Sequence, residues 1–208
     1  MIVSKNKLIK VWDDDNLIQK NIDFLRISTK VVRLPISNYT KEIIQNLLDT
    51  YKSMPCAGIA ANQLGYDEKI FVGMQHDRDW NISKDPLQNI DDVVPHEDNY
   101  DIYINPQIDR VNKNSLQKGE EGCLSIPDIS LDITRYDKIK VRYYDMEGRA
   151  IKKTLKGFIS RLFQHELDHL NGNLMFEDPI SKIGIRDSSP DHLKKKFIKL
   201  YTYIESIK

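Results

Sequence analysis

The stretch Gln164-His165-Glu166-Leu167-Asp168-His169 gives the first indication of both fold and chemistry. Its two histidines are four positions apart, so on a helix they project from the same face. At that spacing one divalent metal can bind both rings, and the glutamate between them can reach a water molecule on the metal as a general base. The stretch therefore predicts a helix that carries a metal site.

The surrounding sequence supports a helix of about residues 155–170, with Asn171-Gly172 as its C-terminal stop. Polar residues on an inward helix face need a partner, and a metal would supply one. The stripe expected to point inward consists of Phe158, Leu162, His165 and His169.

A cysteine lies upstream in Glu121-Gly122-Cys123-Leu124-Ser125. Its thiolate would be a third ligand beside the two histidines. Three protein ligands leave the fourth position of a tetrahedral site open, which is typical of catalytic rather than structural metal sites.

A third motif reads Cys56-Ala57-Gly58-Ile59-Ala60-Ala61-Asn62-Gln63. Small residues and a glycine allow another backbone to approach closely. The glutamine that ends the run carries an amide that can donate to a developing oxyanion. Taken alone, the run would indicate only a tight turn into a buried strand.

The three motifs, in this order, resemble peptide deformylase. That family has Gly-x-Gly-hydrophobic-Ala-Ala-x-Gln, Glu-Gly-Cys-hydrophobic-Ser and Gln-His-Glu-hydrophobic-Asp-His. The second and third are complete here, whereas the first has Cys56 in place of the leading glycine and Asn62 where proline is frequent. The resemblance extends over about residues 43–178 and includes Ile104-Asn105-Pro106.

The expected fold is α+β, with mainly antiparallel sheets packed around a central metal-binding helix and with an N-terminal and a C-terminal helix. Asn38 is a candidate cap for a helix that runs to about Met54. A short strand is expected at 69–74, and strands should dominate from 101 to 154. Within this stretch, residues 139–144 alternate between apolar and polar positions, which predicts a half-buried strand. The C-terminal helix should span 189–206, with Ser189 as its cap.

Length and composition favour one domain over residues 1–208. Residues 75–100 are polar and predict a surface-loop insertion, in which His76 and His96 are expected to be solvated. Lys plus Arg and Asp plus Glu both total 31, so net charge does not argue for DNA or an anionic membrane as a partner.

Neither a membrane-spanning apolar run nor a secretory signal is expected. The two cysteines do not form a disulfide framework and favour a reducing compartment. Together with the resemblance, this implies a bacterial cytoplasm or, in a eukaryote, an organelle.

The resemblance implies removal of the N-formyl group from formyl-methionine at the start of nascent peptides. Its implied metal ligands are Cys123, His165 and His169, and its implied catalytic groups are Glu166, Gln63 and the Leu124 backbone N–H. Support for the cysteine loop would come from Glu121 paired with Arg135. The residues implied to contact substrate are Gly58, Ala57, Gly122, Phe158, Arg161 and Leu162.

Two further positions depart from the family pattern. Arg161 stands where an apolar pocket residue is usual, so it either extends to the pocket rim or narrows the pocket. Ser130 stands where many members carry an arginine near the carboxyl side of the peptide. The metal implied by the resemblance is iron(II), with zinc(II), nickel(II) or cobalt(II) as alternatives that the donor set also allows.

Two other functions stay open from the sequence alone. A His-Glu-x-x-His metalloprotease would take its third ligand from Glu177 or His192 but would leave Cys123 and Gln63 unexplained. A degenerate, peptide-binding relative would need neither Glu166 nor Gln63. Four lysines of the C-terminal helix are expected to lie largely in solvent: Lys194, Lys195, Lys196 and Lys199. They indicate either a solvated face or a surface that contacts the ribosome.

Overall fold

The computed structural model describes residues 8–76, 99–177 and 190–207. Its helices are α1 (Gln19–Leu25), α2 (Asn38–Ser53), α3 (Gly157–Leu170) and α4 (Asp191–Ser206), with short 3-10 helices η1 (Ala61–Leu64) and η3 (Met175–Glu177). Its strands are β1 (Trp12–Asp13), β2 (Asn16–Leu17), β3 (Gly58–Ala60), β4 (Ile70–Gly73), β5 (Asp101–Val111), β6 (Leu116–Cys123), β7 (Ile126–Tyr136), β8 (Lys138–Tyr144) and β9 (Ala150–Lys156).

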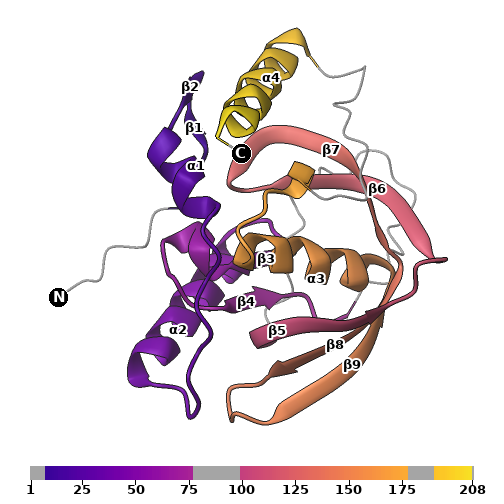
Figure 1. Cartoon of the computed structure of the whole chain (residues 1–208). Helices are drawn as coiled ribbons and strands as arrows, with labels where there is room; N and C mark the ends of the chain where they lie inside the picture. The colour runs from indigo at the N-terminus through magenta and orange to yellow at the C-terminus, as the bar shows by residue number, and fades with distance from the viewer. Residues whose placement is uncertain (1–7, 77–98, 178–189, 208) are drawn as a thin grey trace.

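Five strands form one antiparallel sheet in the order β3-β4-β5-β8-β9, and β6 and β7 form a separate long hairpin. Helix α3 lies between these two layers and contacts strands of both (Figure 1). In β8, Ile139, Val141 and Tyr143 are buried, while Lys140 and Arg142 are exposed, as the alternation predicts. The α+β class with antiparallel sheets is confirmed.

Helix α3 begins at Gly157, two residues later than predicted, because residues 155–156 still pair with β8. Its predicted stop is confirmed: Gly172 has a φ of 76°, and a Cβ there would come within 2.4 Å of the Arg26 carbonyl oxygen. The segment after α1 therefore runs close past the end of α3, and the Thr29 backbone N–H donates to the Leu170 carbonyl at 2.9 Å. This contact fixes the helix end that carries His169.

Two apolar clusters lie on either side of α3. One fills the space between α2, the five-stranded sheet and α3, and includes the aromatic contacts of Phe71 with Tyr103 and Phe163. The other joins α1, β7, η3 and α4, and contains Phe176, Phe197 and Leu200. Cys123 belongs to this second cluster, whereas much of α3 belongs to the first.

Several element boundaries differ from the sequence expectations. Ser37, not Asn38, caps α2: its hydroxyl accepts from the Thr40 N–H at 3.0 Å. The residue before α4 is Pro190, which offers no side-chain cap, and Ser189 lies outside the described residues. The β1–β2 hairpin and α1 were not expected from the weakly patterned first 37 residues.

Most of the predicted loop insertion, including His96, also lies outside the described residues. The single domain over residues 1–208 stays a prediction. Among the helices of the described segments, none combines the length and apolar character that crossing a bilayer requires.

Candidate metal centre

Three potential metal ligands converge where the end of β6 meets α3. The ligand atoms of Cys123, His165 and His169 all lie within 4.8 Å of one another. The Cys123 sulfur is 3.2 Å from Nε2 of His169, and the two imidazole rings are 5.1 Å apart between centroids. One strand end and two successive turns of a helix therefore present a sulfur and two nitrogens to one point.

The chemistry of these donors fits a divalent transition metal. The Nδ1 atom of His165 lies 2.9 Å from a carboxylate oxygen of Glu121, which orients the ring and leaves Nε2 for a metal. Burial favours the neutral thiol of Cys123, but the charge of His169 and hydrogen bonds from both histidines outweigh it and lower its pKa to about 5. A thiolate with two imidazoles suits zinc, iron, nickel or cobalt rather than calcium or magnesium.

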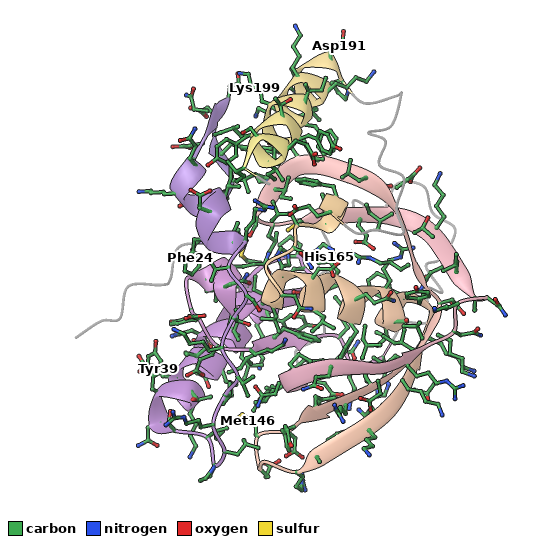
Figure 2. The ribbon with its side chains drawn as sticks, viewed as in Figure 1. Phe24, Tyr39, Met146, His165, Asp191 and Lys199 are labelled. Carbon is green, nitrogen blue, oxygen red and sulfur yellow. The ribbon has the colours of Figure 1, made fainter. Side chains whose placement is uncertain are left out.

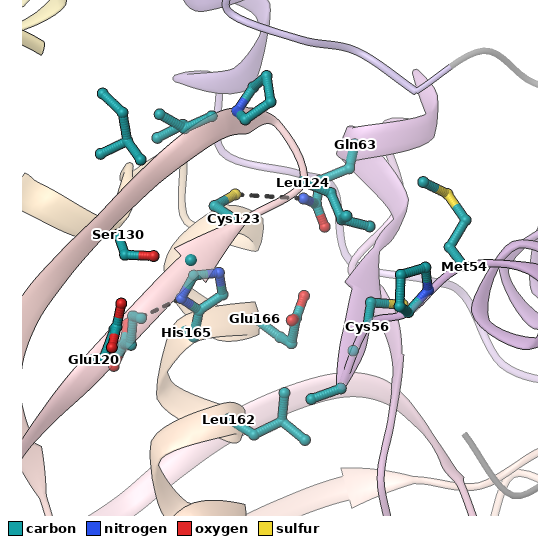
Figure 3. Close-up of a pocket in the computed structure, with 18 of the residues that line it drawn as sticks. Met54, Cys56, Gln63, Glu120, Cys123, Leu124, Ser130, Leu162, His165 and Glu166 are labelled. Atoms are coloured by element: carbon teal, nitrogen blue, oxygen red, sulfur yellow. Dashed lines mark hydrogen bonds and ion pairs between the residues drawn. The ribbon is translucent and has the colours of Figure 1, made fainter. Parts of the chain in front are cut away.

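Glu166 is buried and faces the same pocket from α3 (Figure 3). One of its carboxylate oxygens has no hydrogen-bond partner among the described residues, which is costly for a buried group unless a ligand completes the site. Burial raises the pKa of Glu166 to about 7, although the charges of the two histidines oppose this. A carboxyl group that titrates near neutrality can both accept and return a proton.

Gly58 makes room for this carboxylate. A Cβ at Gly58 would lie 2.7 Å from Oε1 of Glu166 and 2.9 Å from a methyl group of Leu162. The sequence predicted a glycine here for close approach of a substrate backbone. The structure adds a second reason, which depends on the fold and could not be found from the motif alone.

Gln63 approaches the centre from η1, opposite α3 (Figure 3). Its side-chain oxygen accepts from the Ala60 N–H at 2.9 Å, which directs its amide nitrogen toward Ser125 at 3.1 Å and the Cys123 sulfur at 3.7 Å. Leu124 lines the same pocket. The three sequence motifs, distant along the chain, are thus brought together.

Asn62, beside Gln63, has a role that the motif did not indicate. Its side-chain amide donates to the His169 carbonyl at 2.6 Å, and its side chain is buried. The motif that carries Gln63 is therefore tied directly to the helix end that carries a proposed ligand.

Glu121 lies at the centre of a buried charge cluster behind His165. Arg135 donates to both of its oxygens, at 3.0 and 2.9 Å, and also pairs with Asp168. Burial opposes ionisation of Glu121, but hydrogen bonds from His165 and Arg135 outweigh it and hold its pKa well below the usual range. The carboxylate is therefore charged when it receives the imidazole N–H.

The pocket in front of the centre has a volume of about 640 Å³. Phe158, half-exposed, and Leu162 contribute apolar wall, and Ala57, Gly122 and Ser130 also line it. Arg161 is among the lining residues, but its guanidinium does not extend to the rim: it donates to Glu121 at 2.6 Å and to carbonyls of the β6–β7 hairpin. The buried guanidinium is therefore bonded to Glu121 and the hairpin rather than directed into the pocket.

A model of the polypeptide deformylase family matches residues 15–184 of the chain. The chain belongs to this family. It is similar to peptide deformylase of Thermus thermophilus, with 33% identity over 147 residues that cover 69% of this chain and 72% of the relative. Peptide deformylase 2 of Xanthomonas campestris is 31% identical over 183 residues, which cover 86% and 92%.

A solved structure of the class I type b peptide deformylase of Acinetobacter baumannii, bound to Met-Ala-Ser, is also similar. Its TM-score is 0.64 at 26% identity, with coverage of 82% of this chain and 96% of that one. As a peptide deformylase, the chain is a metal-dependent hydrolase that removes the N-formyl group from the formyl-methionine of new polypeptides. The protease and the degenerate binding module are not favoured.

Proposed function

We propose that this deformylase holds one divalent metal on Cys123, His165 and His169 and removes the formyl group at that point. The observation that carries the proposal is the convergence of these three donors within 4.8 Å, beside a pocket that Cys123, His165 and Glu166 line. A Cys–His–His set leaves a coordination position for chemistry.

When bound, the metal supplies Lewis acidity, which makes a water molecule more acidic and polarises a carbonyl group. Glu166 would take a proton from the attacking water and return it to the departing amine. Gln63 and the Leu124 backbone N–H would donate to the oxyanion, and loss of one such donor costs about 3–4 kcal/mol in comparable sites. Glu121, held by Arg135, would orient His165.

The pocket is suited to a peptide that begins with methionine. Phe158 and Leu162 offer apolar surface to its side chain, while Gly58, Ala57 and Gly122 would let an extended backbone approach. The Acinetobacter baumannii relative bound to Met-Ala-Ser supports this substrate class. Because the Arg161 guanidinium is bonded to Glu121 and the hairpin, we assign it no direct contact with the methionine side chain.

We propose iron(II) as the metal in the cell, with zinc(II), nickel(II) or cobalt(II) able to replace it. The sulfur and nitrogen donors accept all four, so availability rather than affinity would decide. Formylated initiation places the enzyme in a bacterial cytoplasm or an organelle.

The proposal is tested with the metal-loaded chain and three peptides: formyl-Met-Ala-Ser, acetyl-Met-Ala-Ser and an unformylated peptide of about ten residues. We expect formate from the first and negligible reaction of the others, and Cys123→Ser should lose most of its metal. Cleavage inside the longer peptide, or unchanged metal content in the variant, would contradict the proposal.

A contact between α4 and the ribosome is a further proposal. Lys195 and Lys199 are exposed, and Lys199 lies at the periphery (Figure 2). The expectation that the four lysines of α4 lie largely in solvent is wrong for Lys196, whose side chain pairs with Asp15 at 3.3 Å and is 14% exposed.

The α4 proposal is tested by ribosome co-sedimentation across a salt series. The Lys195→Glu/Lys199→Glu variant should bind more weakly than the unaltered chain, with a shallower salt dependence. Equal binding by both chains would rule out this contact.

A further inference from the structure

Arg161 is the strongest feature of the site that the mechanism above does not use. It lies one helical turn before His165 on α3, and its side chain is 7% exposed. A guanidinium buried to this degree needs several acceptors, because each unsatisfied N–H in the interior is costly. The hydrogen-bond acceptors of the guanidinium therefore show which parts of the structure Arg161 joins.

The guanidinium donates to acceptors on the two strands of one hairpin. One terminal nitrogen donates to Glu121 Oε1 at 2.6 Å and to the Ile133 carbonyl of β7 at 3.0 Å. The other donates to the Gln117 carbonyl of β6 at 3.0 Å. Arg161 therefore joins α3 to both strands of the hairpin that carries Cys123, and to the carboxylate that orients His165.

The strand beneath the guanidinium is shaped to accept it. A Cβ at Gly119 would lie 3.1 Å from a terminal nitrogen and 3.2 Å from the central carbon of the Arg161 guanidinium. These distances are tighter than ordinary side-chain contacts, so only a glycine leaves the group its full room. The close fit over Gly119 and the hydrogen bonds describe one position of the guanidinium, packed against β6.

Glu121 is the carboxylate that both arginines share. Arg135 and Arg161 face Glu121, and Asp168 adds a second carboxylate through Arg135. Without Arg161, Oε1 of Glu121 would lose its shortest hydrogen bond, at 2.6 Å compared with 3.0 Å from Arg135. The Glu121 carboxylate could then turn, and His165 would lose its fixed orientation.

We propose that Arg161 is a positioning residue of the metal centre, which sets the distance between the Cys123 hairpin and the two histidines of α3 through Glu121. The inference rests on the metal ligands proposed above. It replaces the expectation that Arg161 selects substrates by narrowing the pocket.

The test uses the full chain loaded with nickel(II) or cobalt(II) and the variants Arg161→Met, Arg161→Lys and Gly119→Ala. Arg142→Met is the matched control, because the Arg142 side chain is 54% exposed and lies on β8. The readouts are the rate of nickel(II) transfer to a chelator, the cobalt(II) absorption spectrum, and kcat and KM for formyl-Met and formyl-norleucine peptides.

We expect Arg161→Met to release nickel(II) up to about 10-fold faster, the lower end of the effect of losing a hydrogen-bond partner of a metal ligand, because Arg161 acts on His165 only through Glu121. The cobalt(II) bands should shift, and kcat should fall equally for both peptides with little change in KM. Arg161→Lys should restore only part of the metal retention and of kcat, because an ammonium group cannot reproduce the planar arrangement of the guanidinium donors. Gly119→Ala should change nickel(II) release, the cobalt(II) spectrum and kcat in the same direction as Arg161→Met. Arg142→Met should leave all three unchanged.

Nickel release and cobalt spectra equal to those of the unaltered chain would overturn the inference, even if the free energy of unfolding fell. A change in KM that differs between the formyl-Met and formyl-norleucine peptides would instead mean that Arg161 contacts the substrate side chain, and it would overturn the inference. If Arg161→Met does not fold, Gly119→Ala decides. If the unaltered chain holds no nickel(II), the proposed ligand set is wrong, and the inference fails with it.

Discussion

Glu166 is the residue whose chemistry can be separated from metal binding most directly, because it faces the pocket without belonging to the donor cluster. We expect Glu166→Gln to keep its metal and lose activity by about 10²–10⁴-fold, the usual contribution of a general base. The measurement is kcat for formyl-Met-Ala-Ser together with metal content. Exposed Glu147→Gln is the control, and retention of more than about a tenth of the activity would argue against the role.

Gly58 tests the space around that carboxylate. A Cβ 2.7 Å from Oε1 of Glu166 forces the carboxylate to shift, so Gly58→Ala should lower kcat by at least about tenfold. Metal content and far-UV circular dichroism should stay unchanged, because no proposed ligand is touched. Normal kcat in this variant would mean that the position of Glu166 is not critical.

At the scale of elements, α4 is held by an apolar face rather than by its charges. Leu200 is fully buried in the second cluster, whereas Ile198 on the same helix is 60% exposed. Leu200→Ala should therefore reduce the free energy of unfolding by about 2–5 kcal/mol. Ile198→Ala should change it by less than about 0.5 kcal/mol, as is usual for surface positions.

Urea denaturation of the two α4 variants measures this difference. Equal losses in the free energy of unfolding of the two variants would mean that α4 does not pack through its apolar face. Activity toward a short formyl peptide should be the same in both, since α4 contributes no residue to the pocket in the described part of the chain.

Helical spacing alone predicted that His165 and His169 share one face of α3. Cys123 and Gln63 were expected beside them because the three motifs together resemble peptide deformylase. The long strands were also predictable, since burial follows the alternation of β8. The position of the Arg161 guanidinium was not predictable, because its acceptors belong to a hairpin 28–44 positions away in the sequence. The burial of Lys196 was not predictable either, because it depends on contacts with Asp15 and Trp12 of the N-terminal segment, which are far away in the sequence.

At the scale of the whole molecule, the proposed metal would link two apolar clusters. Cys123 lies in the cluster of α1, β7 and α4, whereas the histidines lie on α3, which packs largely in the other. A ligand that binds only the folded chain stabilises it by about 4 kcal/mol at a thousand times its dissociation constant. Removal of the metal with a chelator should therefore lower the urea midpoint, and Cys123→Ser should lose this dependence.

The most direct test of the central claim is a titration of the metal-free chain with nickel(II) while formate release from formyl-Met-Ala-Ser is measured. We predict no formate without metal, a linear rise in rate, and a plateau at one metal per chain. His165→Ala should show no plateau at one metal per chain. Formate release by the metal-free chain, or a plateau at two metals, would contradict a single centre on Cys123, His165 and His169.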